Sequence, residues 1–217
     1  MIILFKNSKE KNVGSIGIGA MVVFISLVLV AGIAASVLIQ TSTELEMQAL
    51  NTGQETIAET ASGLKVETVE GYNSSGLITK LAIEVAIRAG SPDIDLGESV
   101  VEISDSSNKY ILRYGGAVCA VTDVNGDIFA VGAFGDADDF DIISIQDADS
   151  SCSSNTPVIN FGDHVMLAIS ANLVFTSNSG ILPRTDVSGM VIPEVGAPAI
   201  IGFTSPSSYS DQVMELQ

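Results

Sequence analysis

Hydrophobic residues dominate one long stretch near the start of the chain. Residues 16–39 form a run of 24 without a charge, in which Ser26 and Ser36 carry the only polar side chains, and no charge occurs between Lys11 and Glu44. At about 1.5 Å per residue, such a helix is roughly 36 Å long, and the core of a bilayer is about 30 Å thick. The pattern therefore predicts a helix that can cross a membrane. A buried core helix fits less well, because globular helices are rarely apolar on every side.

The helical pattern continues past residue 39 and then changes to a period of two. Leu45 and Ile57 stay on one face while glutamates occupy the other, and Ser62-Gly63 is a stop signal. Beyond it, we predict strands over residues 64–69, 81–88, 100–103, 109–114, 117–122, 128–133, 141–145, 165–175, 187–192 and 199–203. Many short strands separated by turn signals favour a β-sandwich or barrel.

The charge balance excludes some functions and orients the helix. The 217 residues include 26 acidic and 9 basic side chains, a net charge of −17, so the chain cannot build the basic face that nucleic acid requires. Lys6, Lys9 and Lys11 precede the apolar run and no base follows until Lys65, which places the N-terminus in the cytoplasm and residues beyond about 44 outside.

A secretory signal peptide is the rival interpretation of this N-terminus. Such a peptide has an apolar region of about 7–15 residues that ends at small residues. Here the run is longer, and Gly14 precedes it while Gly17 and Gly19 lie at its beginning. The pattern therefore indicates cleavage on the charged side, with the apolar helix retained.

Several segments resemble archaeal flagellins (archaellins), a family similar to type IV pilins. Residues 11–21, Lys-Asn-Val-Gly-Ser-Ile-Gly-Ile-Gly-Ala-Met, followed by the apolar helix, resemble the N-terminus of that family. Residues 160–167 resemble one of its strands, and residues 184–189, 191–198, 203–209 and 214–217 resemble its C-terminal part. The resemblance is strong over residues 9–60 and 158–217 and weak over 90–155. It departs at Ala20, where threonine is common, and in a leader that is less purely basic than usual.

The resemblance implies three parts in an α+β fold. Residues 1–14 are a leader that a prepilin-type membrane aspartyl peptidase cleaves between Gly14 and Ser15. Residues 15–62 anchor the precursor in the membrane and later form the filament core. Residues 63–217 form an immunoglobulin-like β-sandwich head outside that core.

The resemblance also implies a structural subunit of the extracellular archaeal flagellum, used for swimming, and not an enzyme. Its partners are copies of itself, other archaellins, the peptidase, and the assembly and motor machinery of the membrane. A non-motile adhesive pilus subunit and a single-span surface binding protein are the alternatives. The Pro-Glu-Val-Gly-Ala-Pro segment at residues 193–198 favours the archaellin over the pilus subunit.

Two modifications can be predicted for the part outside the membrane. Cys119 and Cys152 can form a disulfide, which closes a loop of about 34 residues and stabilises by roughly 3–4 kcal/mol. Two buried thiols are the alternative. Asn73-Ser74-Ser75 is the only N-glycosylation sequon, and it lies in a turn signal between two strands.

Candidate sites for metals or catalysis are few. Asp123, Asn125 and Asp127 place three oxygen ligands at alternate positions around a glycine, which suits calcium or magnesium, although the later glutamate of an EF-hand is missing. A second acidic cluster holds Asp136, Asp138, Asp139 and Asp141. The alternative for both is a solvated acidic loop, and no other cofactor is expected. His164 has no partners for a catalytic triad, so we expect a structural role.

Overall fold

The computed structural model describes residues 6–120 and 126–217. They divide into two compact units, Met1–Gln54 and Glu55–Gln217. The first unit is helical, and the second, which we call the head, contains all the strands of the described residues. The α+β class and the long apolar helix are confirmed.

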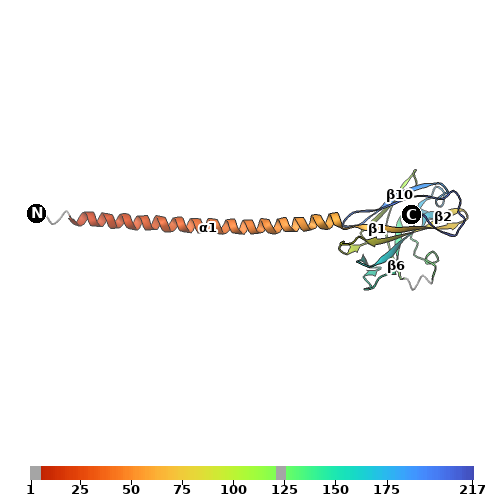
Figure 1. Ribbon diagram of the computed structural model, residues 1–217, viewed down its shortest axis with the longest axis horizontal. Helices are drawn as coiled ribbons and strands as arrows, with labels where there is room; N and C mark the ends of the chain where they lie inside the picture. Colours follow the sequence, from red (N-terminus) through yellow and green to blue (C-terminus); the bar gives the residue numbers. More distant parts are fainter. Residues whose placement is uncertain (1–5, 121–125) are drawn as a thin grey trace. The chain divides into compact units, whose positions relative to one another are not determined.

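The helix α1 runs over Lys6–Ala61 (Figure 1), so it begins before the apolar run and ends one residue before the predicted stop. It ends there because the residues that follow it form hydrogen bonds with a later segment of the head. The carbonyl of Ser62 accepts the Ala197 N–H at 2.8 Å, and Gly63 has a φ of 146°, which a residue with a side chain rarely adopts.

The head contains one large sheet and one small sheet. The large sheet has nine strands in the order β11-β10-β4-β5-β6-β9-β2-β1-β12, and all its pairs are antiparallel except β5–β6. Its strands are β1 Leu64–Ser74, β2 Leu77–Ile87, β4 Val100–Ser104, β5 Lys109–Ala120, β6 Asp139–Gln146, β9 His164–Ile169, β10 Asp186–Ile192, β11 Ala199–Thr204 and β12 Val213–Glu215. The small sheet has the order β3-β8-β7, with β3 Ile94–Asp95, β8 Thr156–Ile159 and β7 Cys152–Ser153.

The large sheet curls until its two ends meet. The Leu64 N–H of β1 donates to the Ala197 carbonyl just before β11, at 3.2 Å. Gln217 also joins β1 to β11. Its carbonyl accepts the Val69 N–H of β1 at 3.1 Å, and its Oε1 accepts the Gly202 N–H of β11 at 2.7 Å. The two layers that face each other across the core are therefore parts of a single curled sheet rather than two separate sheets.

The two faces of the sheet cover two different cores. The main core lies inside the curl and includes Phe140, Leu167 and Phe175, which are all buried. A smaller core lies on the opposite face, where residues 126–134 fold over the sheet and bury Phe129 and Ala133. The backbone of this covering segment is held by the Lys80 ammonium, which donates to the Phe129 carbonyl.

Most of the predicted strands are confirmed, and three predictions are wrong. The strands predicted over 109–114 and 117–122 are one strand, β5, with a register shift between Tyr114 and Val118, and residues 121–122 lie outside the described residues. The strand predicted over 165–175 ends at Ile169 and is followed by the helix α3, Ala171–Val174. Residues 128–133 form turns instead of a strand, because the N–H groups of Phe129 and Ala130 donate to Asp127 instead of to a neighbouring strand.

Candidate functional site

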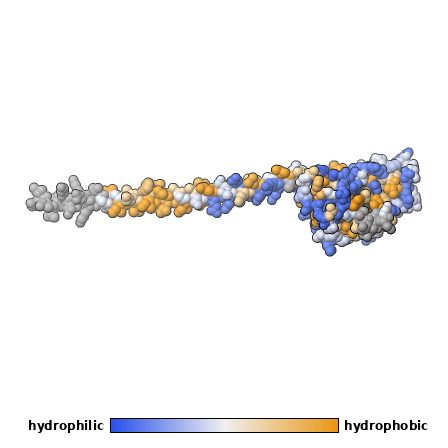
Figure 2. Space-filling view, turned by 60° about the horizontal axis from the view of Figure 1, so that its bottom comes forward, coloured by the Kyte–Doolittle hydropathy of each residue, from blue (hydrophilic) through white to orange (hydrophobic). Residues whose placement is uncertain are grey.

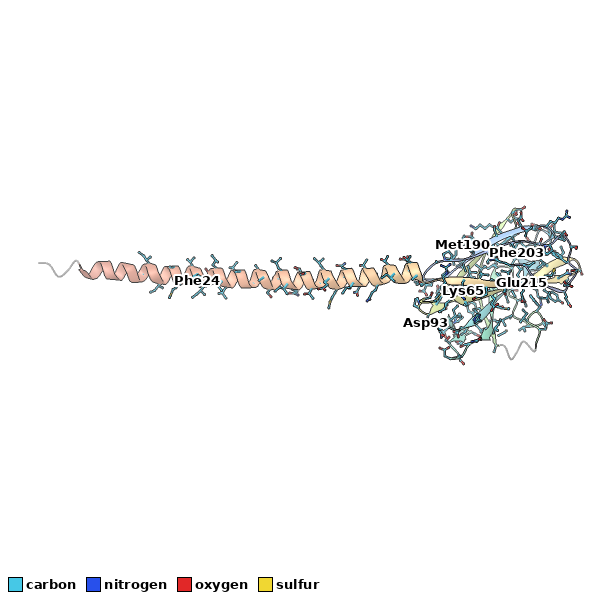
Figure 3. The ribbon with its side chains drawn as sticks, viewed as in Figure 1. Phe24, Lys65, Asp93, Met190, Phe203 and Glu215 are labelled. Carbon is cyan, nitrogen blue, oxygen red and sulfur yellow. The ribbon has the colours of Figure 1, made fainter. Side chains whose placement is uncertain are left out.

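The apolar part of α1 is the largest hydrophobic surface in the described chain. Its side chains are exposed all around the helix, and Phe24, for example, is 69% exposed and points into open space (Figure 3). Figure 2 shows this stretch as nearly continuous hydrophobic surface, whereas the head has a mixed surface. Monomeric soluble proteins rarely expose such a patch, so this surface indicates a partner or a membrane.

The helix is suited to an apolar environment in its hydrogen bonding as well as in its composition. The Ser26 hydroxyl donates to the Val23 carbonyl at 2.8 Å, and the Thr41 hydroxyl donates to the Leu38 carbonyl at 3.0 Å. These hydroxyls therefore need no water. Among the described residues, α1 is the one helix long and apolar enough to cross a membrane.

No close contact within the described chain explains the glycines of α1. A methyl group added at Gly17, Gly19 or Gly32 would meet nothing within 4 Å, so no close contact in the described structure requires glycine there. Glycine weakens a helix by about 1 kcal/mol relative to alanine. Small residues let two helices approach closely, so these positions favour packing against another helix.

The predicted cleavage site lies within α1. Gly14 and Ser15 are exposed and helical, and among the described residues nothing beyond the adjacent helix backbone lies within 4 Å of the position of a Cβ on Gly14. A peptidase would have to unwind the first turns of the helix to cut the peptide bond between Gly14 and Ser15, and cleavage itself stays a prediction.

The two cysteines pack into different cores, and both are thiols in this structure. Cys119 on β5 packs against the smaller core, whereas Cys152 on β7 belongs to the main core on the other face of the sheet. The predicted disulfide is therefore not formed here, because the sheet lies between the two positions. A disulfide between them stays a prediction.

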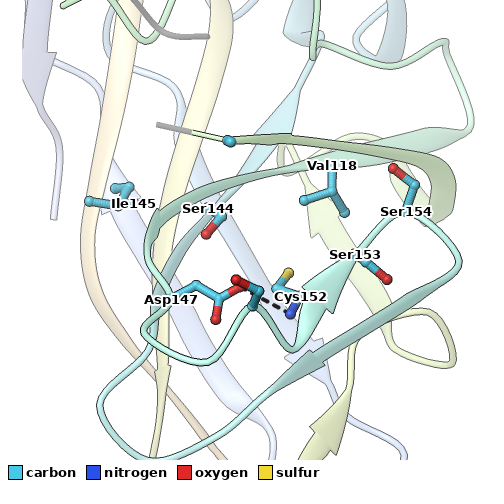
Figure 4. Close-up of a pocket in the computed structure, with 9 residues that line it drawn as sticks. Val118, Ser144, Ile145, Asp147, Cys152, Ser153 and Ser154 are labelled. Atoms are coloured by element: carbon cyan, nitrogen blue, oxygen red, sulfur yellow. Dashed lines mark hydrogen bonds between the residues drawn. The ribbon is translucent and has the colours of Figure 1, made fainter. Parts of the chain in front are cut away.

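Cys152 lines a cavity of about 410 Å³ beside the ends of β5 and β6 (Figure 4). Its backbone N–H donates to Asp147 Oδ2 at 3.1 Å. Burial, together with the nearby carboxylates of Asp147 and Asp163, raises the pKa of the Cys152 thiol to about 12. The reactive form of a cysteine is the thiolate, so this thiol is a poor nucleophile at neutral pH.

The acidic groups come together in a place that the sequence did not indicate. Carboxylate oxygens of Asp147, Asp149 and Asp163 lie within 4.8 Å of one another, and Asp163 is only 3% exposed. This set has the oxygen ligands that a divalent cation prefers. The same carboxylates also accept hydrogen bonds from the backbone of Ser151 and Asn160, so they already stabilise the β7–β8 region. The alternation of Asp147 and Asp149 is visible in the sequence, but Asp163 joins them only through the fold.

The predicted cation loop is only partly visible. Asp123 and Asn125 lie outside the described residues, and Asp127 caps a turn by accepting the Phe129 N–H at 3.0 Å. Calcium or magnesium at this loop stays a prediction.

In the second acidic cluster, burial raises the pKa of Asp141, and the nearby carboxylates of Asp139 and Asp136 raise it further. Asp141 Oδ1 accepts the Ala117 N–H.

Asn73 and His164 both have structural contacts. Asn73 is half-buried at the β1–β2 turn, where its Oδ1 accepts the Gly76 N–H at 3.1 Å and its amide donates to the Asp211 carbonyl at 3.3 Å. A glycosylated asparagine keeps one N–H, so that donation is compatible with a glycan, which stays a prediction. His164 Nδ1 lies 3.1 Å from Glu84 Oε1.

The chain is similar to known archaeal proteins over almost its whole length. The family model for archaeal-type flagellin matches residues 14–203. Flagellin B2 of Methanocaldococcus jannaschii is 43% identical over 209 residues, covering 94% of this chain and 95% of that protein. Flagellin B1 of Methanococcus voltae is 40% identical over 208 residues, with the same coverage of 94% and 95%.

Two solved structures agree with these sequence matches. The crystal structure of archaeal flagellin FlaB1 from Methanocaldococcus jannaschii has a TM-score of 0.64 and 39% identity, covering 72% of this chain and 98% of that chain. The archaeal flagellum of Methanospirillum hungatei strain JF1 has a TM-score of 0.60 and 16% identity, covering 91% and 98%. At that identity the likeness shows a shared fold.

Proposed function

Because the chain belongs to the archaeal-type flagellin family, we propose that it is the structural subunit of an extracellular archaeal flagellar filament. Copies pack through the apolar part of α1, and the heads form the outer layer. The observation that carries this proposal is the exposure of apolar side chains on all sides of α1 over residues 16–39. The match to the flagellum of Methanospirillum hungatei supports the same architecture.

The energetics of the helix favour a filament that does not dissolve. In the membrane and in a filament core the helix is equally removed from water, so the hydrophobic term nearly cancels between the two. Close packing at the glycines has to supply the preference for the filament. Moving about 1,500 Å² of apolar helix into water costs on the order of 35 kcal/mol as an upper bound. Assembly therefore takes place at the membrane, with the assembly and motor machinery supplying energy.

Removal of the leader makes the helix compatible with a filament core. Lys6, Lys9, Glu10 and Lys11 are the charges of the first 14 residues, and an unpaired buried charge costs several kcal/mol. A prepilin-type peptidase that cuts between Gly14 and Ser15 removes all four and changes the side-chain net charge from −17 to −19. Until then, the apolar helix anchors the precursor in the membrane, and the three lysines keep its N-terminus in the cytoplasm.

N-terminal sequencing of filaments sheared from cells tests this function directly. We expect a thread visible by electron microscopy that consists of this polypeptide beginning at Ser15. Gly14→Leu is expected to block cleavage and leave the chain in the membrane fraction. Gly19→Leu, the same substitution beyond the cleavage site, is expected to permit cleavage. Recovery of wild-type chains only as intact monomers in detergent would instead support the single-span surface protein.

A further inference from the structure

Two oppositely charged features lie beyond the two ends of strand β10. Arg184 comes two residues before the strand and Glu194 two residues after it, and both are exposed. The ion pairs of the described residues join Lys65 to Glu67, Lys109 to Glu102 and His164 to Glu84, so neither Arg184 nor Glu194 has an ionic partner there.

Arg184 is held in a strained backbone conformation. Its φ is 63°, in the left-handed region that residues with side chains adopt infrequently. The backbone is fixed there because the Arg184 N–H is shared between the carbonyls of Ser205 and Pro206, both at 3.2 Å. By contrast, the Arg88 guanidinium donates to the Leu64 carbonyl and so has a role inside the head. Strain of this kind clusters at functional positions, and here it presents an exposed guanidinium to the surroundings.

The other feature is a groove of about 390 Å³ lined by Glu55, Glu59, Glu194, Val195 and Gly196. Glu55 and Glu59 lie one turn apart on the end of α1 that belongs to the head unit. The groove holds three carboxylates and no basic side chain. Its floor is tight, because a Cβ on Gly196 would lie 2.6 Å from atoms of Ser62. Three like charges around one hollow repel each other, and a cation that enters it removes this repulsion.

The two features cannot meet within one copy. The seven residues of β10 separate them by roughly 23 Å at about 3.3 Å per residue, which is much longer than an arginine side chain. Between copies the situation differs, because a contact that joins opposite ends of the same molecule repeats without closing and builds a filament.

We propose that Arg184 of one copy docks in the groove of Glu55, Glu59 and Glu194 on the next copy along the filament. This contact rests on the proposed function and adds to it the feature that sets the register between heads. The head, residues 55–217, carries six basic and 23 acidic side chains, a net charge of −17, so most alignments of two heads are repulsive. A single arginine opposite an all-acidic groove then selects one alignment among many, since complementary charges act mainly on specificity.

A charge swap tests the contact in an archaeal host that lacks its own flagellins. R184E and E194R are each expected to reduce the subunit in the sheared filament fraction about tenfold, and the double variant R184E/E194R is expected to restore most of it. R113E is the control for reversing a basic side chain elsewhere in the sheet, because Arg113 is also exposed, lies on β5 and forms none of the ion pairs above. Filaments of R184E in wild-type amounts would overturn the contact, as would a loss in R113E equal to that in R184E.

A second experiment does not depend on how well the reversed charges are tolerated. R184K keeps the charge and adds an amine that a carbodiimide can join to a neighbouring carboxylate. In R184K filaments we expect mass spectrometry to find position 184 joined to Glu55, Glu59 or Glu194 of another copy. Links confined to other carboxylates would refute the docking while leaving the filament itself in place. A wild-type chain that forms no filament at all would refute the proposed function instead.

Discussion

The helix and the head use the same aliphatic residues for opposite purposes. In the head, Leu64, Ile83 and Ile142 are fully buried inside the curled sheet, so the chain satisfies them itself. In α1, Ile16, Leu29 and Ile39 are each more than 60% exposed, and no part of the described chain covers them. The head is therefore built as a folded unit, and the helix is built to be completed by lipid or by other copies. Four predictions test this contrast, beginning with the largest expected effect.

A charge in the apolar helix should abolish the filament without harming the head. Ile25→Asp places a carboxylate where the proposed core has no partner for it, at a cost of several kcal/mol in each copy. Ile111→Asp is a close control, because Ile25 and Ile111 are both 58% exposed. We expect electron microscopy to show no filaments for the first variant and normal filaments for the second. Filaments from Ile25→Asp would show that α1 is not in the core.

A cavity in the main core should unfold the head and leave the helix intact. Phe140→Ala removes a fully buried ring and should destabilise the head by about 3–5 kcal/mol. Phe161→Ala is the control, because Phe161 is 80% exposed, and its effect should stay within about 0.5 kcal/mol. Thermal unfolding of the full chain in detergent, followed by circular dichroism, measures both. Equal shifts for the two variants would contradict the burial described here.

A larger residue at a helix glycine should stabilise the helix of the precursor and destabilise the filament. Gly32→Leu strengthens the isolated helix by up to about 1 kcal/mol, since nothing in the chain lies close to position 32. In the filament the side chain would keep neighbouring helices apart, so the filament should melt at a lower temperature. Calorimetry of filaments and helicity of the detergent-bound chain give the two values. A filament that is stabilised would mean that position 32 faces away from its neighbours.

The smallest predicted effect concerns the buried thiol. Because the pKa of Cys152 is raised from 9.0 to about 12, its contribution to stability is complete below about pH 9 and is lost as the pH rises towards 12. Ionisation of this thiol should lower the free energy of unfolding of the head by about 1 kcal/mol between pH 8 and pH 10, which urea unfolding measures. Cys152→Ala should remove that part of the slope, whereas Cys119→Ala should keep it.

A thiol count on the denatured wild-type chain is the companion measurement. Two reactive thiols are expected from the structure. A count of zero, rising to two after reduction, would establish the disulfide that the sequence suggested, and it would require the sheet between the two cores to rearrange.

The strand predictions succeeded where one face of a strand is buried and the other is exposed. Burial alternates in this way along β4 and β11, and both strands lie where they were expected. The prediction for residues 128–133 is wrong because the same apolar composition can serve a turn that covers a second core. The short strands β3, β7, β8 and β12 have two to four residues each, too few for a period to emerge.

The sequence by itself determined the apolar helix and the change to a β-rich head, because each depends on the local order of residue types. Only the tertiary structure decided which distant groups meet or stay apart. It placed Asp163 beside Asp147, put a sheet between Cys119 and Cys152, and brought Glu194 to the end of α1. Such relations depend on how the sheet curls and on which strands pair, and contacts between residues far apart in the chain leave no periodic signal in it.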